Sequence, residues 1–231
     1  MTEHRQPSAT SSAEFHCWYA GDAPSALVKG RYNLDKFARF LHPGPVVDLG
    51  CGEGALLLAL KEAGHADLTG VESNPELCAL AESFGVRVIQ TDLQQYLAGA
   101  LTPAAYFYLD VIEHVPFALN LRLFAALPQG SRLILQTPNT ESIQGHQFYL
   151  NVPSHLAPYS PWVIRRMLAR FGYDVVAEGT VEGDHPRTWK NRLRAFFIRK
   201  VLGLAPDLLL GGGNYFVVAD RIRQEGEARL G

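Results

Sequence analysis

The feature that most constrains this chain is an apolar run that ends in an acid and leads directly into a turn with three glycines. Residues 46–54 read Val-Val-Asp-Leu-Gly-Cys-Gly-Glu-Gly. Glycine adopts positive φ without a steric penalty and has no Cβ, so such a turn can bring the backbone close to a ligand. Residues 55–63 predict a helix that stops at Gly64. A buried strand, a glycine turn and a helix in this order are typical of nucleotide-binding α/β sheets.

The next two predicted strands also end in acids. The strand over 67–71 is followed by Glu72, and the strand over 86–90 is followed by Thr91, Asp92 and Leu93. An acid after the second strand can accept hydrogen bonds from ribose hydroxyls. Because the carboxyl ends of parallel strands meet at one edge of a sheet, we expect these acids and Asp48 to line a single nucleoside site.

The glycines alone leave the cofactor open, because Gly50-x-Gly52-x-x-Ala55 also fits the loose form of the dinucleotide fingerprint. A short-chain dehydrogenase is the strongest competing enzyme class. Its Tyr-x-x-x-Lys pair is present only as Tyr32 and Lys36, which precede the glycine turn and so stand in the wrong order. A tight turn without any ligand is the third interpretation.

Together these residues resemble the class I S-adenosylmethionine-dependent methyltransferases, whose first motif has the form Asp-Leu-Gly-Cys-Gly-x-Gly, as at 48–54. The resemblance extends over about residues 28–182. It implies a doubly wound, seven-stranded, mostly parallel α/β sheet and S-adenosylmethionine as the cofactor. It also implies roles for six residues: Asp48, Gly50 and Gly52 around the methionine portion, Glu72 on the ribose, Asp92 near the adenine amine and Leu93 beside the ring.

A second cluster of functional groups, Asp110, Glu113 and His114, ends the fourth predicted strand. A helical turn there would place Asp110 and Glu113 on one face. Oxygen and imidazole ligands can form part of a divalent metal shell, for which Mg²⁺ is the expected ion. A similar acid-x-x-Glu-His arrangement occurs in O-methyltransferases of ubiquinone biosynthesis and in small-RNA 2′-O-methyltransferases, where the first acid is usually Glu. The simpler interpretation is a helix-start acid beside a histidine that is satisfied by the backbone.

A third segment, residues 148–160, follows Thr137-Pro-Asn139 and contains His155. It resembles the Phe-Tyr-x-Asp-Pro-x-His-x-x-Pro segment of bacterial methyltransferases linked to surface-polysaccharide and lipopolysaccharide assembly, with Asn151 where that pattern usually has Asp. We expect His155 either to deprotonate the acceptor or to complete the metal shell with the second cluster. The catalytic candidates are therefore His155, His114 and Glu113, and the metal candidates are these three and Asp110. A loop histidine that only packs is the alternative.

Length and composition predict one methyltransferase domain over 45–231, preceded by a disordered tail at 1–14 and a helical cap at 15–44 with a helix near 34–41. Lys29 and Arg31 could hold the cofactor's carboxylate, although surface cations are the simpler interpretation. The tail lacks the apolar segment of a secretory signal, and the three cysteines suggest neither disulfides nor zinc. We therefore expect a cytoplasmic protein. A net charge of −2 gives no drive toward nucleic acid, and no nucleic-acid partner is expected.

Between the sixth and seventh predicted strands, at 173–177 and 214–219, lies an insertion at about 185–212. Residues 187–202 contain six Lys and Arg side chains and no acid, interleaved with apolar residues. Folded as a helix, this stretch could lie on the inner face of an anionic membrane or hold a phosphorylated glycolipid acceptor. The alternative is a solvated helix packed on the domain.

These observations favour transfer of a methyl group to a hydroxyl oxygen of a sugar or glycan, because a protonated hydroxyl is a poor nucleophile that needs a base or a metal. A quinone-precursor or other small-molecule O-methyltransferase is the second hypothesis. The third is a non-catalytic scaffold that binds the cofactor, which would require neither His114 nor His155.

Overall fold

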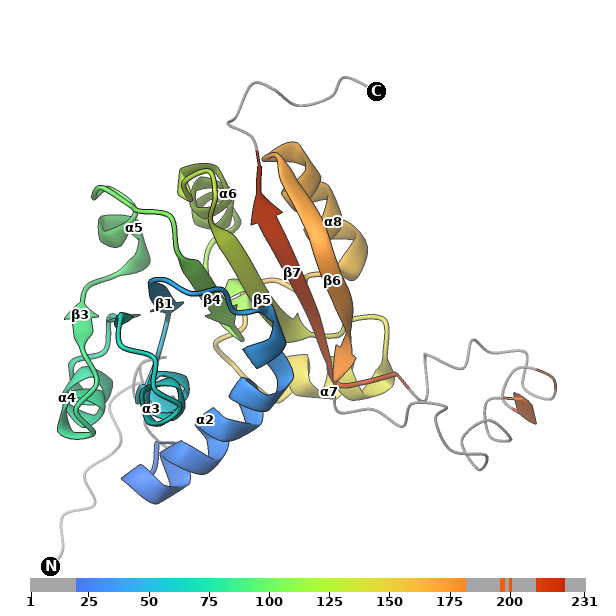
Figure 1. The fold of residues 1–231 in the computed structure, drawn as a ribbon. Helices are drawn as coiled ribbons and strands as arrows, with labels where there is room; N and C mark the ends of the chain where they lie inside the picture. The colour runs from blue at the N-terminus through green and yellow to red at the C-terminus, as the bar shows by residue number, and fades with distance from the viewer. Residues whose placement is uncertain (1–19, 182–195, 198–199, 201–210, 223–231) are drawn as a thin grey trace, which may run out of the picture.

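The computed structural model of the chain describes residues 20–181, 196–197, 200 and 211–222. These residues contain a seven-stranded sheet in the order β3-β2-β1-β4-β5-β7-β6 (Figure 1). The strands are β1 Val46–Leu49, β2 Leu68–Glu72, β3 Val88–Gln90, β4 Ala105–Leu109, β5 Arg132–Pro138, β6 Tyr173–Val181 and β7 Asn214–Arg221. Strand β7 is antiparallel to β5 and β6, and the other neighbouring pairs are parallel. The predicted doubly wound, mostly parallel sheet is confirmed.

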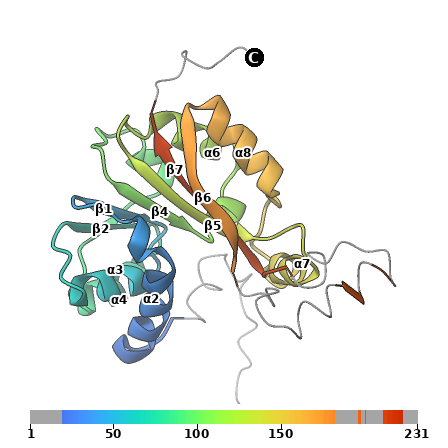
Figure 2. The ribbon, with the colours of Figure 1, turned by 45° about the vertical axis from the view of Figure 1, so that its right-hand side comes forward.

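Helices cover both faces of this sheet (Figures 1 and 2). One face is covered by α2 Ala23–Phe37, α3 Ala55–Glu62 and α4 Pro75–Ser83. The opposite face is covered by α5 Leu93–Tyr96, α6 Phe117–Ala126 and α8 Pro161–Arg170. Three further elements are α7 Ile143–Leu150 and the 3₁₀ turns η1 Ala38–Phe40 and η2 Ile112–His114.

The core is divided by the sheet into two layers, as strand alternation requires. Toward α2 and α3, the strands contribute Val46, Phe107, Ile134 and Val218. Toward α6 and α8, they contribute Leu49, Tyr106, Tyr108, Leu133, Leu135 and Val217. The central strands β1, β4 and β5 are therefore apolar on both faces, and polar side chains gather at their carboxyl ends.

Helix α2 packs closely on α3, which fixes the cap of the domain beside the glycine turn. A Cβ on Gly30 would lie 1.9 Å from the carbonyl oxygen of Ala55, so the two backbones approach within a distance that only glycine permits. The helix begins earlier than the expected 34–41. Asp22 caps it by accepting a hydrogen bond from the Ser25 amide, and a proline follows in its first turn.

Two other segments differ from the sequence-based expectation. Helix α7 was not predicted, and it is held by the Ser142 hydroxyl, which accepts a hydrogen bond from the Gly145 amide. Strand β6 continues past the predicted end at residue 177 to Val181, because it pairs with β7 to Asn214 across a bulge between Val175 and Ala177. Both differences arise from tertiary contacts that local propensity does not encode.

The proposed tail at 1–14 and most of the basic insertion lie outside the described residues. Membrane binding by 187–202 therefore stays a prediction. Of that stretch, Phe196, Phe197 and Lys200 are described, and all three are exposed. Among the helices of the described part, none combines the length and apolarity needed to cross a membrane.

Replacement of Gly30 by Ala should destabilise the protein, because the new methyl group would collide with the carbonyl of Ala55. We expect the free energy of unfolding in urea to fall by about 2 kcal/mol or more, since overpacking outweighs the gain of about 1 kcal/mol in helix propensity. The control is Val28→Ala on the same helix, where the side chain is 69% exposed and the change should stay within about 0.5 kcal/mol. Equal stabilities of the two variants would contradict the close packing of α2 on α3.

Candidate functional site

The glycine turn after β1 is held to the end of β2 by backbone hydrogen bonds. The amides of Gly50 and Cys51 donate to the carbonyl of Val71 at 2.8 and 3.1 Å, and Gly50, Gly52 and Gly54 have φ of 74°, 55° and 76°. A Cβ on Gly50 would lie 2.7 Å from the side chain of Val111, whereas a Cβ on Gly52 would meet nothing within 4 Å. The turn therefore requires glycine, and it leaves room for a ligand above Gly52.

A cavity of about 650 Å³ opens at this turn. Its size is in the range of small-molecule and cofactor sites. Five of the six predicted cofactor-binding residues line it, namely Gly50, Gly52, Glu72, Asp92 and Leu93. Apolar surface is added by Val71, Leu77 and Leu119. The cavity therefore combines carboxylates, which can accept hydrogen bonds from hydroxyl and amine groups, with a surface that fits an aromatic base.

Glu72 is oriented by three backbone amides. Its Oε1 accepts hydrogen bonds from the amides of Ser73 and Asn74, each at 2.8 Å, and its Oε2 accepts one from the Gly52 amide at 3.0 Å. These bonds hold the carboxylate at the end of β2 and on the wall of the cavity. Asp92 is fixed in a comparable way, because its Oδ1 accepts a hydrogen bond of 2.7 Å from the Gln95 amide at the start of α5.

Asp48 lies beneath the glycine turn and does not line the cavity. Only 5% of its surface is exposed. Burial, and secondly the negative charge of Glu72, raise the pKa of the Asp48 carboxyl to about 7. Its contact with a cofactor stays a prediction.

Lys29 and Glu53 form an ion pair at the side of the cavity, with 2.7 Å between Nζ and Oε1. The other carboxylate oxygen of Glu53 accepts a hydrogen bond of 2.6 Å from the Gly21 amide, and so anchors the start of α2. Arg31, by contrast, pairs with Glu62 on the surface. Glu53 was not identified from the sequence, because a contact between α2 and the turn leaves no local pattern.

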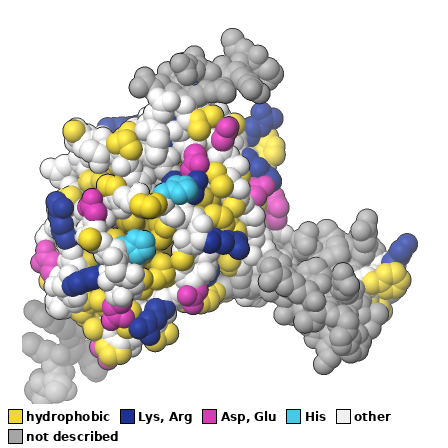
Figure 3. Space-filling model, in the orientation of Figure 1, with side chains coloured by type: hydrophobic (Ala, Val, Ile, Leu, Met, Phe, Trp, Pro, Cys, Tyr) yellow, Lys and Arg dark blue, Asp and Glu magenta, His cyan; other side chains and the backbone are white. Residues whose placement is uncertain are grey.

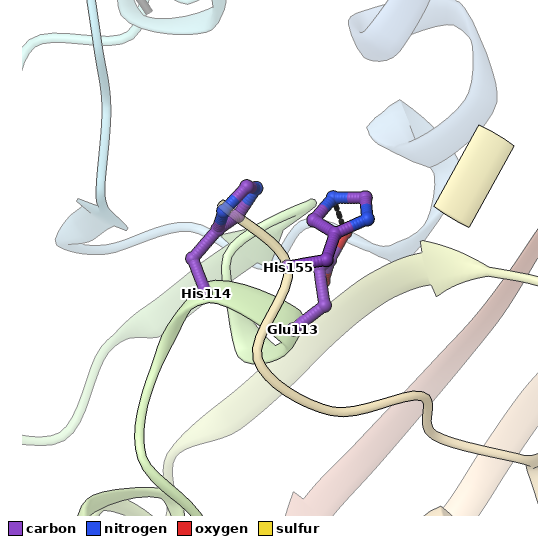
Figure 4. A group of neighbouring side chains, drawn as sticks. All are labelled: Glu113, His114 and His155. Atoms are coloured by element: carbon purple, nitrogen blue, oxygen red, sulfur yellow. Dashed lines mark ion pairs between the residues drawn. The ribbon is translucent and has the colours of Figure 1, made fainter. Parts of the chain in front are cut away.

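A second group of side chains lies beside the cavity: Glu113, His114 and His155 (Figure 4). One possible ligand atom from each residue lies within 4.8 Å of the others. Glu113 and His114 come from η2, and the loop with His155 is held against η2 by the Leu156 amide, which donates to the Glu113 carbonyl at 2.7 Å. His114 also lines the cavity, so this cluster adjoins the cofactor site.

Hydrogen bonds orient both imidazoles. Nδ1 of His155 lies 2.7 Å from the carbonyl oxygen of Tyr149, which can only accept, so Nδ1 carries the proton. Nε2 of His155 lies 3.9 Å from Oε1 of Glu113. Nδ1 of His114 lies 3.3 Å from the carbonyl oxygen and 3.0 Å from the hydroxyl of Ser154. A histidine that donates through one nitrogen to a carbonyl presents the other to a metal or a proton.

Glu113 is an unusual carboxyl group, because it is 1% exposed and only one of its oxygens is hydrogen-bonded. Oε2 accepts from the Thr137 hydroxyl at 3.0 Å, whereas Oε1 is buried and accepts no hydrogen bond from the described residues. Burial, and secondly the charge of Asp110, raise the pKa of Glu113 to about 8. A proton or a cation next to Oε1 would offset the energy of burying this charge.

The structure brings together three of the four predicted metal ligands, and Asp110 is not in the group. Asp110 has φ of 55° and is the described non-glycine residue with positive φ. Its Oδ2 accepts a hydrogen bond of 2.7 Å from Gln136, whose own side-chain oxygen accepts from Lys36 at 3.3 Å. Gln136 and Thr137 were not predicted as site residues. The sequence did contain a signal for them, because both are polar residues at the end of an apolar strand.

The donor set differs from the oxygen-rich site expected for magnesium. Without Asp110, the group offers one carboxylate and two imidazoles. Mg²⁺ prefers oxygen ligands, whereas imidazole suits transition ions, and carboxylate together with imidazole suits Mn²⁺ or Fe²⁺. Such an ion fits Oε1 of Glu113, which is buried and accepts no hydrogen bond from the described residues. It also fits the tautomer of His155, whose proton on Nδ1 leaves Nε2 as the possible ligand atom.

Comparison with known proteins identifies the family and agrees with the fold. A family model described as a methyltransferase domain matches residues 27–178. A S-adenosylmethionine-dependent methyltransferase from Archaeoglobus fulgidus is similar in structure, with a TM-score of 0.70, 21% identity and coverage of 89% of this chain and 97% of that one. No curated protein sequence is significantly similar to the chain.

Two further structures share the fold at lower similarity. The methyltransferase domain of bacterial CtHen1-C has a TM-score of 0.57 and 17% identity, covering 86% of this chain and 99% of that one. The plantazolicin methyltransferase BamL, solved with a substrate analogue and S-adenosylhomocysteine, has a TM-score of 0.56 and 14% identity, covering 92% of this chain and 90% of that one.

The buried carboxyl of Asp48 should make stability depend on pH. Its pKa is about 7 in the folded protein and near 3.8 in the unfolded chain, so the folded state retains a proton that the unfolded chain loses. The stabilising contribution is complete below about pH 4 and is lost as the pH rises through 7, at up to about 1.4 kcal/mol per pH unit. Asp48→Asn should remove this slope, so that the variant gains stability relative to wild type between pH 4 and 7 in urea titrations. Parallel curves for the two proteins would show that Asp48 is ionised when folded.

Proposed function

The chain belongs to the family of methyltransferase domains and uses S-adenosylmethionine, and from this premise we propose that it methylates a hydroxyl oxygen of a sugar or glycan. The observation that carries the proposal is the cluster of Glu113, His114 and His155 next to the cofactor cavity. A neutral amine can attack without losing a proton first, but a hydroxyl is a weak nucleophile until its proton is removed or its pKa is lowered.

The cavity residues fit the cofactor. Glu72 would bind the ribose hydroxyls, Asp92 and Leu93 would contact the adenine, and the turn at Gly50 and Gly52 would lie against the methionine portion, in keeping with the presence of all five residues in the cavity lining. When bound, S-adenosylmethionine supplies a methyl group on a positively charged sulfur, which leaves as a neutral thioether. The residues of the chain contribute by holding the acceptor oxygen in line and by excluding water.

The cluster can handle the acceptor's proton in two ways. Nδ1 of His155 donates a hydrogen bond to the Tyr149 carbonyl, so Nε2 can accept a proton from the acceptor hydroxyl. The carboxylate of Glu113, next to Nε2, would stabilise the positive charge of the protonated imidazole. Alternatively, Glu113, His114 and His155 would hold a divalent ion, which would lower the pKa of an acceptor hydroxyl. Both routes activate an oxygen acceptor. Both also use residues for which a non-catalytic scaffold would have no role.

Two lines of support point to a sugar. The segment 148–160 resembles that of methyltransferases linked to surface-polysaccharide assembly. This segment contacts η2 through a hydrogen bond from the Leu156 amide to the Glu113 carbonyl. The Asp110-x-x-Glu113-His114 arrangement resembles that of enzymes that methylate a ribose hydroxyl. A phenolic acceptor such as a quinone precursor is the second candidate, and it is favoured by the apolar side chains of Val115 and Leu119 along the cavity beside His114.

Acceptor identity can be tested by measuring S-adenosylhomocysteine release with a panel of oligosaccharides, catechols and a short RNA. The panel also includes primary and secondary amines without free hydroxyl groups. We expect an oligosaccharide to raise the rate above the uncoupled background and to carry the new methyl group on oxygen, as mass spectrometry would show. Transfer to catechols alone would support the quinone alternative. Transfer to amines alone, with hydroxyl compounds inert, would contradict O-methylation.

His155→Ala should lower turnover about a hundredfold, which is the usual scale for a positioned base, and leave the dissociation constant for S-adenosylhomocysteine nearly unchanged in calorimetry. The matched control is His146→Ala on α7, where the histidine is exposed and lies outside the cluster. Turnover that survives in His155→Ala, or that falls equally in both variants, would rule out the assigned role.

Metal dependence can be measured by binding as well as by rate. After treatment with a chelator, Mn²⁺ should bind in calorimetry and restore activity better than Mg²⁺, because two of the three donors are imidazoles. Glu113→Gln should weaken Mn²⁺ binding about a hundredfold, whereas Asp110→Asn should have a much smaller effect. Absence of Mn²⁺ binding, with rates indifferent to chelator and to both ions, would leave His155 as a base acting without metal.

A further inference from the structure

A second hollow lies between α6 and α8, on the face of the sheet opposite α2 and α3. Its volume is about 620 Å³. The floor is apolar and includes Leu121, Ala125 and Met167, while Arg122, Arg166 and Arg170 stand along it. None of these residues belongs to the cofactor cavity or to the cluster of Glu113, so the site described above does not account for this groove.

The groove has charge of a single sign. Among the residues that the structure describes, those lining the groove include no acid, and neither α6 nor α8 contains Asp or Glu. The face shown in Figure 3, by contrast, carries acidic and basic side chains interspersed, in keeping with the net charge of −2. Arg165 on α8 is paired with Glu178 at 2.9 Å and does not line the groove. The concentration of positive charge is therefore a property of this surface and not of the whole chain.

Two large aromatic side chains stand at the groove. Trp162 is the second residue of α8 and is 60% exposed, and Phe117 begins α6 and is 51% exposed. The guanidinium of Arg166 lies 5.2 Å from the centre of the Trp162 ring, so a cation and an amphipathic ring face the same region. Trp is enriched where membranes meet water, since its ring is apolar and its N–H remains able to donate to headgroups.

We propose that this groove docks the protein on an anionic phospholipid surface. The arginines match the phosphate groups, which a planar guanidinium binds through two parallel hydrogen bonds. Trp162 and Phe117 would enter the interfacial layer, and the apolar floor would cover the first carbons of the lipid chains. An acidic peptide is the less suitable occupant, because a peptide groove buries its anchoring side chains whereas here the aromatic rings are more than half exposed.

The groove adjoins the cofactor cavity, so docking there would affect where the cavity lies relative to the membrane. Phe117 directly follows Pro116, which lines the cofactor cavity, and its ring stacks on Tyr159 with 6.5 Å between centroids. Docking at Trp162 and Phe117 would therefore bring the bilayer to the side of the cofactor cavity that contains His114. The inference does not depend on which acceptor is methylated, and it concerns a surface other than residues 187–202.

The test is sedimentation of the full chain with vesicles of phosphatidylcholine alone and with vesicles that also contain phosphatidylglycerol. We expect binding to the anionic vesicles only, with loss in high salt. The double variant R166Q/R170Q should bind about thirtyfold more weakly, at about fivefold for each charge near an anionic surface. The matched control is R165Q, which removes an arginine from the same helix but not from the groove, and it should bind as wild type does.

A placement measurement complements the affinities. Brominated phosphatidylglycerol should quench tryptophan fluorescence in the wild type, and W162F should lose most of this quenching while it keeps its melting temperature. Failure of the wild type to bind anionic vesicles would overturn the proposal. So would equal binding by R166Q/R170Q and R165Q, which would place any membrane contact elsewhere. Binding to poly-L-glutamate with no binding to vesicles would also overturn it and would identify an acidic protein as the occupant.

Discussion

The amide of Gly52 donates a hydrogen bond to the carboxylate of Glu72 at 3.0 Å, and this bond joins the glycine turn to the end of the neighbouring strand. With the amides of Gly50 and Cys51 bonded to the Val71 carbonyl, the turn has a fixed conformation. The cavity wall, the orientation of Glu72 and the start of α3 all follow from this one connection. A ligand that meets Glu72 therefore also meets the turn, which is how a sheet edge becomes a nucleoside site.

Burial of charge shapes both halves of the site. Asp48 beneath the turn and Glu113 in the adjoining cluster have carboxyl groups with pKa values raised to about 7 and about 8, in each case mainly by removal from water. The surroundings differ, however, because Glu113 has an imidazole nitrogen 3.9 Å from its unpaired oxygen. A raised pKa beside an oriented base is a frequent property of functional sites.

The seven-stranded, mostly parallel sheet could be predicted from the sequence, because glycines, acids and apolar runs follow one another in a pattern with few structural solutions, and five of the six proposed cofactor residues line the cavity. The acids at the carboxyl ends of β1 and β2 and the Glu113–His114 pair belong to such patterns. Helix α7 and the extension of β6 were not predicted, since a side-chain cap at Ser142 and pairing with β7 determine them. Asp110 was grouped with the metal ligands because spacing alone cannot show that Gln136 holds its carboxylate.

The sequence by itself determined the fold class, because backbone sterics and strand periodicity are local properties, and its resemblance to class I methyltransferases indicated the cofactor. Only the tertiary structure decided which side chains meet. It placed His155 next to Glu113 across 42 positions of sequence, left Asp110 outside their group of possible ligand atoms, and set the arginines of α6 and α8 along one groove. Such contacts depend on packing between elements distant in the chain, where burial and hydrogen bonding select among partners that local sequence treats as equivalent.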